Sequence, residues 1–186
     1  HVITDLGNGF VLLHIDRLLL HDLSGARALR EVTEKGYTPA QPRLIYATPD
    51  HAISTMPGRT EETFPPGAPL LKGLRENTRK FGIHLFDIGK DGNGIVHIVG
   101  PEQGLTLPGT TLVCGDSHTC THGGMGSLAF GIGSSELEHV LATQTMVQRK
   151  PKRLRVQFEG KVPEGVTAKD MILHLIGDLG TVAGTG

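Results

Sequence analysis

The 186-residue sequence has no tryptophan, and aromatic residues make up only 4% of it. It also has no excess of positive charge, since 18 Lys and Arg face 19 Asp and Glu and the formal net charge is -1. Proteins that bind nucleic acid by neutralising phosphates need a basic surface, so we expect no nucleic-acid partner. No apolar run approaches the roughly 20 residues of a membrane-spanning helix, so we expect no membrane span.

Cysteine is equally scarce, with Cys114 and Cys120 as the two examples. Two thiolates are too few for an iron–sulfur cluster, which typically takes three or four. Both lie in a stretch rich in glycine and histidine, which is a poor setting for a structural disulfide, and no secretory signal precedes them. The sequence therefore predicts reduced thiols and a cytoplasmic location.

Glycine, by contrast, is abundant at 26 residues, about twice the average usage. Histidine is also frequent, with 10 residues, two of which, His118 and His122, lie close together in the glycine-rich stretch. The sequence starts at His1 without a methionine and ends in a glycine-rich turn at Gly186. We therefore expect residues 1–186 to be a single, incomplete domain from a longer protein.

Strand-like and helix-like segments alternate along the chain, which predicts an α/β domain with a mainly parallel sheet. The apolar runs predict strands, and the polar segments between them predict helices and a Pro- and Gly-rich loop over 56–69. Ser24, Ser135 with Glu138, and Thr167 with Asp170 are expected helix caps. The predicted strands are 10–15, 43–47, 83–86, 95–99, 110–114 and 154–158, and the predicted helices are 26–35, 70–81, 135–147 and 167–179.

Three segments place ionisable side chains within or just after predicted strands: Asp50-His51, His97, and Asp116-Ser117-His118. Ligands of parallel α/β sheets bind at the carboxyl ends of the strands. A carboxylate beside a histidine can fix its tautomer and raise its pKa, which favours acid–base catalysis near neutral pH. Taken singly, each segment also fits a helix cap with a histidine in a polar core position.

A zinc site at His118 and His122 is a weaker alternative. Histidines four positions apart share one face of a helix. Here they follow a predicted strand directly, lack a Glu after the first His, and precede glycines that disfavour a helix.

The stretch LPGTTLVCGDSHTCTHGGMGSLAFGIGSSELEHVLATQT, residues 107–145, resembles the large-subunit family of the 3-isopropylmalate dehydratases in the aconitase superfamily. The segments ATPDHAIST, GNGIVHIVGPEQG and VTAKDMILHLIG resemble the same family in the same order. This likeness covers essentially the whole chain. It implies a three-layer α/β/α fold, here truncated, with a mainly parallel sheet.

The resemblance also implies a lyase of leucine (branched-chain amino acid) biosynthesis. Such a hydro-lyase interconverts 2-isopropylmalate and 3-isopropylmalate through isopropylmaleate. It implies a [4Fe-4S] cluster that acts as a Lewis acid, and a small subunit as partner in a heterodimer or larger assembly.

By the same resemblance, Asp50 and His51 form one acid–base pair, and His97 and Asp116 form a second pair held across two strands. Ser117 would contact a substrate carboxylate, and His118 would hydrogen-bond near the iron-bound water or hydroxyl. The family's three cluster cysteines lie downstream of Gly186, so no metal ligand is expected in this segment. We therefore expect this chain to be inactive alone.

Two alternatives stay open at this point. One is a sister hydro-lyase of the superfamily that acts on homoaconitate or on methylmalate-like or dimethylmalate-like acids. The other is a binding or assembly module that uses the same fold without catalysis.

Overall fold

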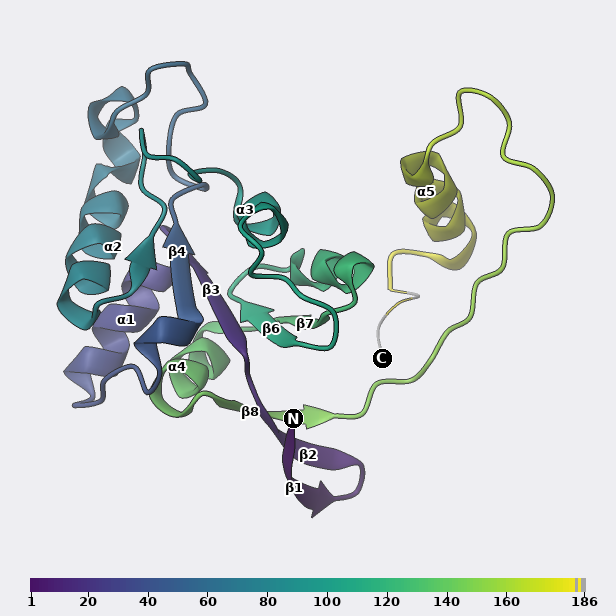
Figure 1. Cartoon of the computed structure of the whole chain (residues 1–186), viewed down its shortest axis with the longest axis horizontal. Helices are drawn as coiled ribbons and strands as arrows, with labels where there is room; N and C mark the ends of the chain where they lie inside the picture. Colours follow the sequence, from purple (N-terminus) through teal and green to yellow (C-terminus); the bar gives the residue numbers. More distant parts are fainter. Residues whose placement is uncertain (183, 185–186) are drawn as a thin grey trace.

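The computed structural model describes residues 1–182 and 184 (Figure 1). Residues 183, 185 and 186, which belong to the glycine-rich end of the sequence, lie outside the described part. The central feature is a five-stranded sheet in which every pairing is parallel. Its strands, in the spatial order β5-β4-β3-β6-β7, are β5 (His84–Leu85), β4 (Ile45–Thr48), β3 (Arg17–His21), β6 (Thr111–Cys114) and β7 (Leu128–Gly131).

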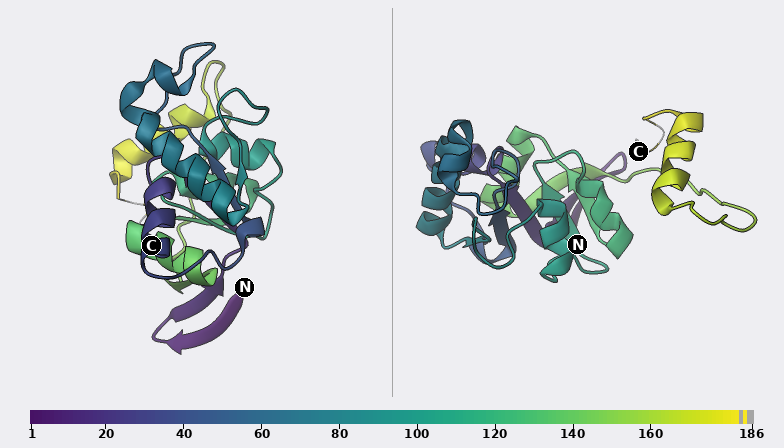
Figure 2. Two further views of the ribbon diagram at one scale, coloured as in Figure 1. Left: turned by 90° about the vertical axis from the view of Figure 1, so that its left-hand side faces the viewer. Right: turned by 90° about the horizontal axis from the view of Figure 1, so that it is seen from above.

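Helices cover both faces of this sheet, because its central strands are apolar at consecutive positions. Leu18 and Leu20 of β3 are buried in a cluster with α1 (Gly25–Glu34), α2 (Ala68–Phe81) and α4 (Ser134–Thr143). Leu19 between them is buried on the opposite face, in a cluster that includes α3 (Val96–Glu102). The result is a three-layer α/β/α arrangement, as expected (Figures 1 and 2).

The order of the strands creates a reversal point beside β3. From β3 the chain moves outward to β4 and β5, and then returns to the other side of β3 to form β6 and β7. In doubly wound sheets, ligands bind at the carboxyl ends of the strands where the order reverses. This topology directs attention to the residues that follow β3, β4 and β6.

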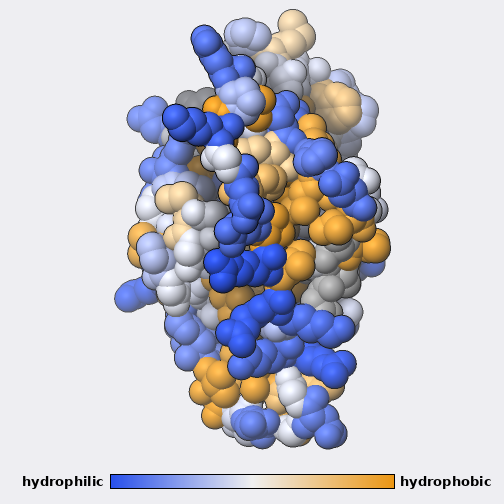
Figure 3. Space-filling view, turned by 90° about the vertical axis from the view of Figure 1, so that its right-hand side faces the viewer, coloured by the Kyte–Doolittle hydropathy of each residue, from blue (hydrophilic) through white to orange (hydrophobic). Residues whose placement is uncertain are grey.

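A second, antiparallel sheet has the order β1-β2-β8, with β1 (Val2–Gly7), β2 (Phe10–His14) and β8 (Thr145–Arg149). Beyond β8 the chain runs irregularly away from the body and then forms α5 (Ala168–Leu179), none of whose residues is buried. Figure 3 views the molecule from the side of α5 and shows hydrophobic and strongly hydrophilic surface side by side. Among the described residues, no helix has both the length and the apolar character needed to cross a membrane.

The prediction of a strand over 95–99 is wrong, because these residues begin α3. Their β-branched side chains favour strands. In the structure, however, Asp50 Oδ2 accepts a hydrogen bond from the Val96 backbone N–H at 2.7 Å. This bond stabilises the first turn of the helix, since the early N–H groups of a helix have no partner within it. His97 therefore projects from a helix and not from a strand.

Four further assignments differ from the sequence-based predictions. Residues 154–158 are irregular and exposed, and pair with no strand among the described residues. The central strand β3 and the strand β7 were not predicted. The predicted helix over 135–147 ends at Thr143, and Gln144 turns the chain with φ 57° into β8.

The caps also differ in part. Ser24 precedes α1, but its hydroxyl bonds His21 and not the helix backbone. The box at α4 joins Gly133 N–H to Glu136, whereas Glu138 pairs with Lys35. The predicted box of α5 is confirmed, since Asp170 accepts from the Thr167 backbone at 2.7 Å.

Replacing Gly126 by valine is expected to destabilise the fold. Gly126 has φ 81°, and a Cβ there would lie 3.3 Å from Cα of Pro108. A left-handed conformation costs an L-residue roughly 1–2 kcal/mol, and a β-branched side chain is among the worst suited to it. The free energy of unfolding measured in urea should fall by about 1–2 kcal/mol. A variant as stable as the parent would contradict this reading.

Candidate active site

Asp116 is the centre of a group of ionisable side chains at the carboxyl end of β6. Its Oδ2 lies 3.1 Å from His51 Nε2, and its Oδ1 lies 3.1 Å from His118 Nδ1 and 3.5 Å from His97 Nε2. The three imidazoles come from the loop after β4, from α3 and from the turn after β6. The carboxylate itself is largely buried, with 10% of its side chain exposed. Three histidines thus meet at one carboxylate.

This environment keeps Asp116 ionised. Burial alone would raise its pKa, but hydrogen bonds from the backbone N–H and imidazole of His118, together with the proximity of His97, outweigh burial. The pKa of Asp116 therefore lies well below its usual range. A permanent negative charge is fixed between the three rings.

His51 is held on its other side by Asp50. Its Nδ1 lies 2.5 Å from Asp50 Oδ1, and its Nε2 faces Asp116. Burial would lower the pKa of His51, but the bond to Asp50 and the charges of Asp50, Asp116 and Asp22 outweigh it and raise the pKa. A raised pKa favours the protonated imidazole, which can donate a proton.

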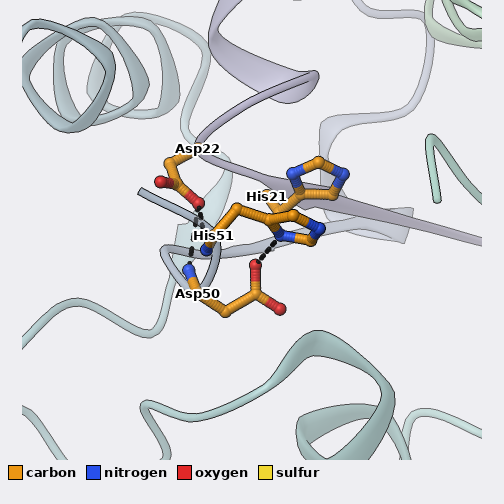
Figure 4. A group of neighbouring side chains, drawn as sticks. All are labelled: His21, Asp22, Asp50 and His51. Atoms are coloured by element: carbon orange, nitrogen blue, oxygen red, sulfur yellow. Dashed lines mark hydrogen bonds and ion pairs between the residues drawn. The ribbon is translucent and has the colours of Figure 1, made fainter. Parts of the chain in front are cut away.

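Asp22, directly after β3, fixes the loop that carries this pair (Figure 4). Its carboxylate is fully buried and accepts three backbone N–H bonds. Oδ1 accepts from Asp50 and His51, both at 3.0 Å, and Oδ2 accepts from Ala52 at 2.6 Å. A buried carboxylate with three such bonds determines the path of the loop.

His21, Asp22, Asp50 and His51 each place one potential ligand atom within 4.8 Å of the others, as a metal site would require. Those atoms are already engaged, however. Asp22 binds the loop backbone, Asp50 binds His51 and Val96, and His21 Nε2 lies 3.1 Å from the Gly115 carbonyl and 2.9 Å from Ser24 Oγ. We interpret this group as a scaffold for the loop.

The His21 ring also supports His51 directly. The two rings are stacked, with centroids 3.9 Å apart and an angle of 20° between their planes (Figure 4). Burial and then the charge of His51 lower the pKa of His21, so it stays neutral beside a charged ring. A neutral, buried ring is a rigid platform for its neighbour.

His97 is bonded from behind by a second histidine. Its Nδ1 lies 3.0 Å from His122 Nε2, and His122 Nδ1 lies 2.8 Å from Thr106 Oγ1. His122 is fully buried, and burial and then His97 lower its pKa to about 4. His97 Nε2 is buried too and has no hydrogen-bond partner among the described residues; its contact with Asp116 Oδ1 is an approach of 3.5 Å.

The structure therefore brings five of the six predicted site residues into one connected group: Asp50, His51, His97, Asp116 and His118. Ser117 is exposed beside them, with its Oγ 3.5 Å from His118 Nδ1. The zinc alternative does not fit. His118 is 83% exposed, whereas His122 is buried with both ring nitrogens engaged.

Sequence reasoning missed Asp22, His21, Thr106 and His122 as parts of the site. His21-Asp22 follows a strand just as the other pairs do, and that position was the available signal. The signal was lost because β3 was not recognised. Thr106 and His122 carry no such signal, since their role depends on contact with His97 from two other segments.

Neither cysteine fits a resident iron–sulfur cluster. Cys114 is fully buried at the end of β6, and burial raises the pKa of its thiol, which disfavours the thiolate that binds metal. Cys120 is exposed in the 3-10 turn Thr119–Met125. Two cysteines of such different setting do not form the three-thiolate set that the family resemblance implies.

The buried His122 predicts a loss of stability in acid. The unfolded chain binds a proton there below pH 6.5, but the folded chain does so only near pH 4. Stability therefore falls as the pH drops through this window. His21 acts in the same direction, and the raised pKa of His51 acts in the opposite one.

Comparison with His122→Gln isolates the contribution of His122. When the pH falls from 7 to 5, the free energy of unfolding measured in urea should decrease by about 2 kcal/mol more for the parent than for the variant. His139→Gln, which alters an exposed histidine, is the control and should keep the parental pH dependence. If the free energy of unfolding depended on pH in the same way in the parent and in His122→Gln, the prediction would be refuted.

Comparison with known proteins identifies the family of this chain. The chain is 59% identical over all 186 residues to the 3-isopropylmalate dehydratase large subunit 1 of Bradyrhizobium diazoefficiens. The match covers 100% of this chain but 39% of that protein, so the chain spans well under half of its relative. Residues 1–186 also match the model of the aconitase family (aconitate hydratase). With its whole length matched, and with a three-layer α/β fold, this chain belongs to the aconitase family.

Proposed function

We propose that this chain is the N-terminal portion of a dehydratase large subunit that interconverts 2-isopropylmalate and 3-isopropylmalate through isopropylmaleate. The observation that carries the proposal is the convergence of His51, His97 and His118 on the ionised Asp116. Such a group serves proton transfer, which dehydration and rehydration both require. The name of the 59% identical relative supports the substrate.

The side chains divide the work of a hydro-lyase between them. A leaving hydroxyl departs as water after it gains a proton, and a proton leaves the neighbouring carbon. His51, with its raised pKa and its bond to Asp50, is suited to donate a proton. His118 turns Nδ1 towards Asp116, which leaves Nε2 free to bond a substrate hydroxyl at the exposed side of the site.

Ser117 and Asp116 have supporting roles in this proposal. The Ser117 hydroxyl is exposed beside His118 and can donate a hydrogen bond to a substrate carboxylate. Asp116 stays ionised and stabilises whichever of the surrounding imidazoles is protonated. His97 faces the same carboxylate from α3 and forms the second acid–base pair.

The [4Fe-4S] cluster that the family resemblance implies does not fit the two cysteines of this chain. We propose that its ligands lie on the remainder of the protein, and that the isolated chain is inactive for this reason. A small-subunit partner follows from the relative's designation as a large subunit.

A chimera tests the proposal. The matching segment of the Bradyrhizobium diazoefficiens large subunit is replaced by residues 1–186 of this chain, and the chimera is produced with that organism's small subunit. We expect conversion of 2-isopropylmalate, followed by the absorbance of the unsaturated intermediate, within about tenfold of the parent enzyme. His97→Gln in the chimera should lower turnover on the order of 10²-fold or more, while His139→Gln should not.

A chimera that folds and binds its small subunit but dehydrates no 2-isopropylmalate would overturn the proposal. Activity restricted to a homoaconitate-like or methylmalate-like acid would instead assign a sister reaction of the family. Full activity of the His97→Gln chimera would remove His97 from the proton-transfer group.

A further inference from the structure

Thr106, His122, His97 and Asp116 form a row of polar groups in contact. Hydrogen bonds of 2.8 Å from Thr106 Oγ1 to His122 Nδ1 and 3.0 Å from His122 Nε2 to His97 Nδ1 join the first three, and His97 Nε2 approaches Asp116 Oδ1 at 3.5 Å without a hydrogen bond. Thr106 is 3% exposed and His122 is 0% exposed. Each proton in the row must therefore be assigned to a bond within it.

The charge at one end fixes the direction of the row. Ionised Asp116 can only accept, and its charge favours a proton on the nearer nitrogen of His97, Nε2, at 3.5 Å. A neutral His97 with that proton offers Nδ1 as an acceptor. His122 must donate to it from Nε2, since His122 is also neutral. Its Nδ1 is left to accept the hydroxyl proton of Thr106.

The opposite direction leaves a proton without a partner. If His97 gained a proton on Nδ1, His122 would have to move its own proton to Nδ1 and donate to Thr106. The Thr106 hydroxyl proton would then need another acceptor, and Thr106 Oγ1 has no second hydrogen-bond partner among the described residues. A buried, unsatisfied hydroxyl is costly.

The backbone of α3 holds this pair in place. A Cβ on Gly100 would lie 2.7 Å from His122 Cε1 and 2.8 Å from Thr106 Oγ1, so that the absence of a side chain permits the contact. The Gly100 carbonyl also accepts from the backbone N–H groups of Leu105 and Thr106, at 2.8 and 3.0 Å. A side chain at position 100 would displace the imidazole or the hydroxyl from this contact.

We propose that Thr106 and His122 are positioning residues that keep the proton of His97 on Nε2, directed at Asp116, and oppose protonation of Nδ1. The inference deepens the proposed function, on which its catalytic meaning rests. The titratable groups that face His97 are Asp116 from the end of β6 and His122 from the turn after it. His51 and His118 contact the same carboxylate and act on His97 through it.

The test is the protonation state of His97 in this chain, read from the ¹⁵N chemical shifts of its ring nitrogens and assigned by loss of the signal in His97→Gln. In the neutral form we expect the proton on Nε2. In Thr106→Val, the valine can neither donate a hydrogen bond to His122 Nδ1 nor accept one from it. The two tautomers of His122 then lose the same partner, and His122 no longer favours one tautomer of His97. The ratio of neutral His97 protonated on Nδ1 to neutral His97 protonated on Nε2 should then rise about tenfold.

Thr78→Val is the matched control, because it removes a buried hydroxyl in α2 that bonds the Leu74 carbonyl. It should leave the tautomer ratio of His97 unchanged. A neutral parental His97 with its proton on Nδ1 would overturn the proposal, and so would an unchanged tautomer ratio in a folded Thr106→Val variant. If that variant fails to fold, the tautomer of His97 measured in the parent chain still tests the proposal.

The outcome is separable from that of the proposed function. The tautomer is measured on this chain without substrate or partner, whereas the chimera measures turnover. An inactive chimera with His97 protonated on Nε2 would overturn the reaction and keep the positioning role. An active chimera with the proton of His97 on Nδ1 would support the reaction and overturn the positioning role.

Discussion

Asp116→Asn is expected to lower turnover of the chimeric enzyme on the order of 10³-fold. Asparagine has nearly the same shape as aspartate. Its side-chain oxygen can still accept a hydrogen bond from the backbone N–H of His118, which in the parent donates to Asp116 Oδ1 at 2.8 Å. It cannot supply the negative charge that faces His51, His97 and His118. Since loss of one general acid or base costs roughly 10²- to 10⁴-fold, loss of the group that serves three imidazoles should lie well inside that range.

The measurement is steady-state turnover of 2-isopropylmalate over a range of pH. Asp91→Asn is the matched control, because it neutralises an exposed carboxylate in the loop before α3 and should leave turnover unchanged. A folded Asp116→Asn enzyme with more than about a tenth of parental turnover would show that the charge is not needed.

Asp22→Ala is expected to give the largest loss of stability, about 3–5 kcal/mol in urea unfolding of this chain. The carboxylate is fully buried and accepts three backbone N–H bonds from the loop at residues 50–52. Alanine would leave three donors without a partner, and each hydrogen bond to a charged group contributes about 1.5–3 kcal/mol. Water can replace part of these three hydrogen bonds in the variant, so the expected loss of stability is about 3–5 kcal/mol, less than the sum of the three bonds.

The loop should also lose its order in the variant. Asp50 and His51 would no longer be fixed, and the bond from Asp50 to the Val96 N–H would weaken with them. Faster amide exchange at residues 50–52 and at Val96 would report this. Asp5→Ala, which removes one exposed bond to the Gly7 N–H, is the control and should cost about 1 kcal/mol or less. Equal losses in the two variants would refute the role of Asp22.

Much of the candidate site could be predicted because its residues lie next to apolar runs. Asp50-His51 follows β4, and Asp116-Ser117-His118 follows β6, so that recognition of two strands placed both pairs at one edge of the sheet. The same reasoning missed His21-Asp22. Leucine favours helices as well as buried strands, and Leu18, Leu19 and Leu20 do not alternate with polar residues.

Local preference also failed where a distant side chain decided the conformation. Residues 95–99 are rich in β-branched side chains, yet Asp50, 46 positions before Val96, accepts the first N–H of the helix that forms there. The alternating run at 154–158 shows the converse. Its side chains fit a strand, but a strand also needs a neighbour, and none pairs with it among the described residues.

The sequence by itself determined the α/β class, most of the helices, and the three segments that carry Asp50, His51, His97, Asp116 and His118, because composition, periodicity and strand-end position are local properties. Only the tertiary structure decided that these groups share one carboxylate, that Asp22 holds the loop, and that His122 and Thr106 lie behind His97. Those facts depend on contacts between residues far apart in the chain. They arise when a parallel sheet brings the ends of β3, β4 and β6 to the same edge.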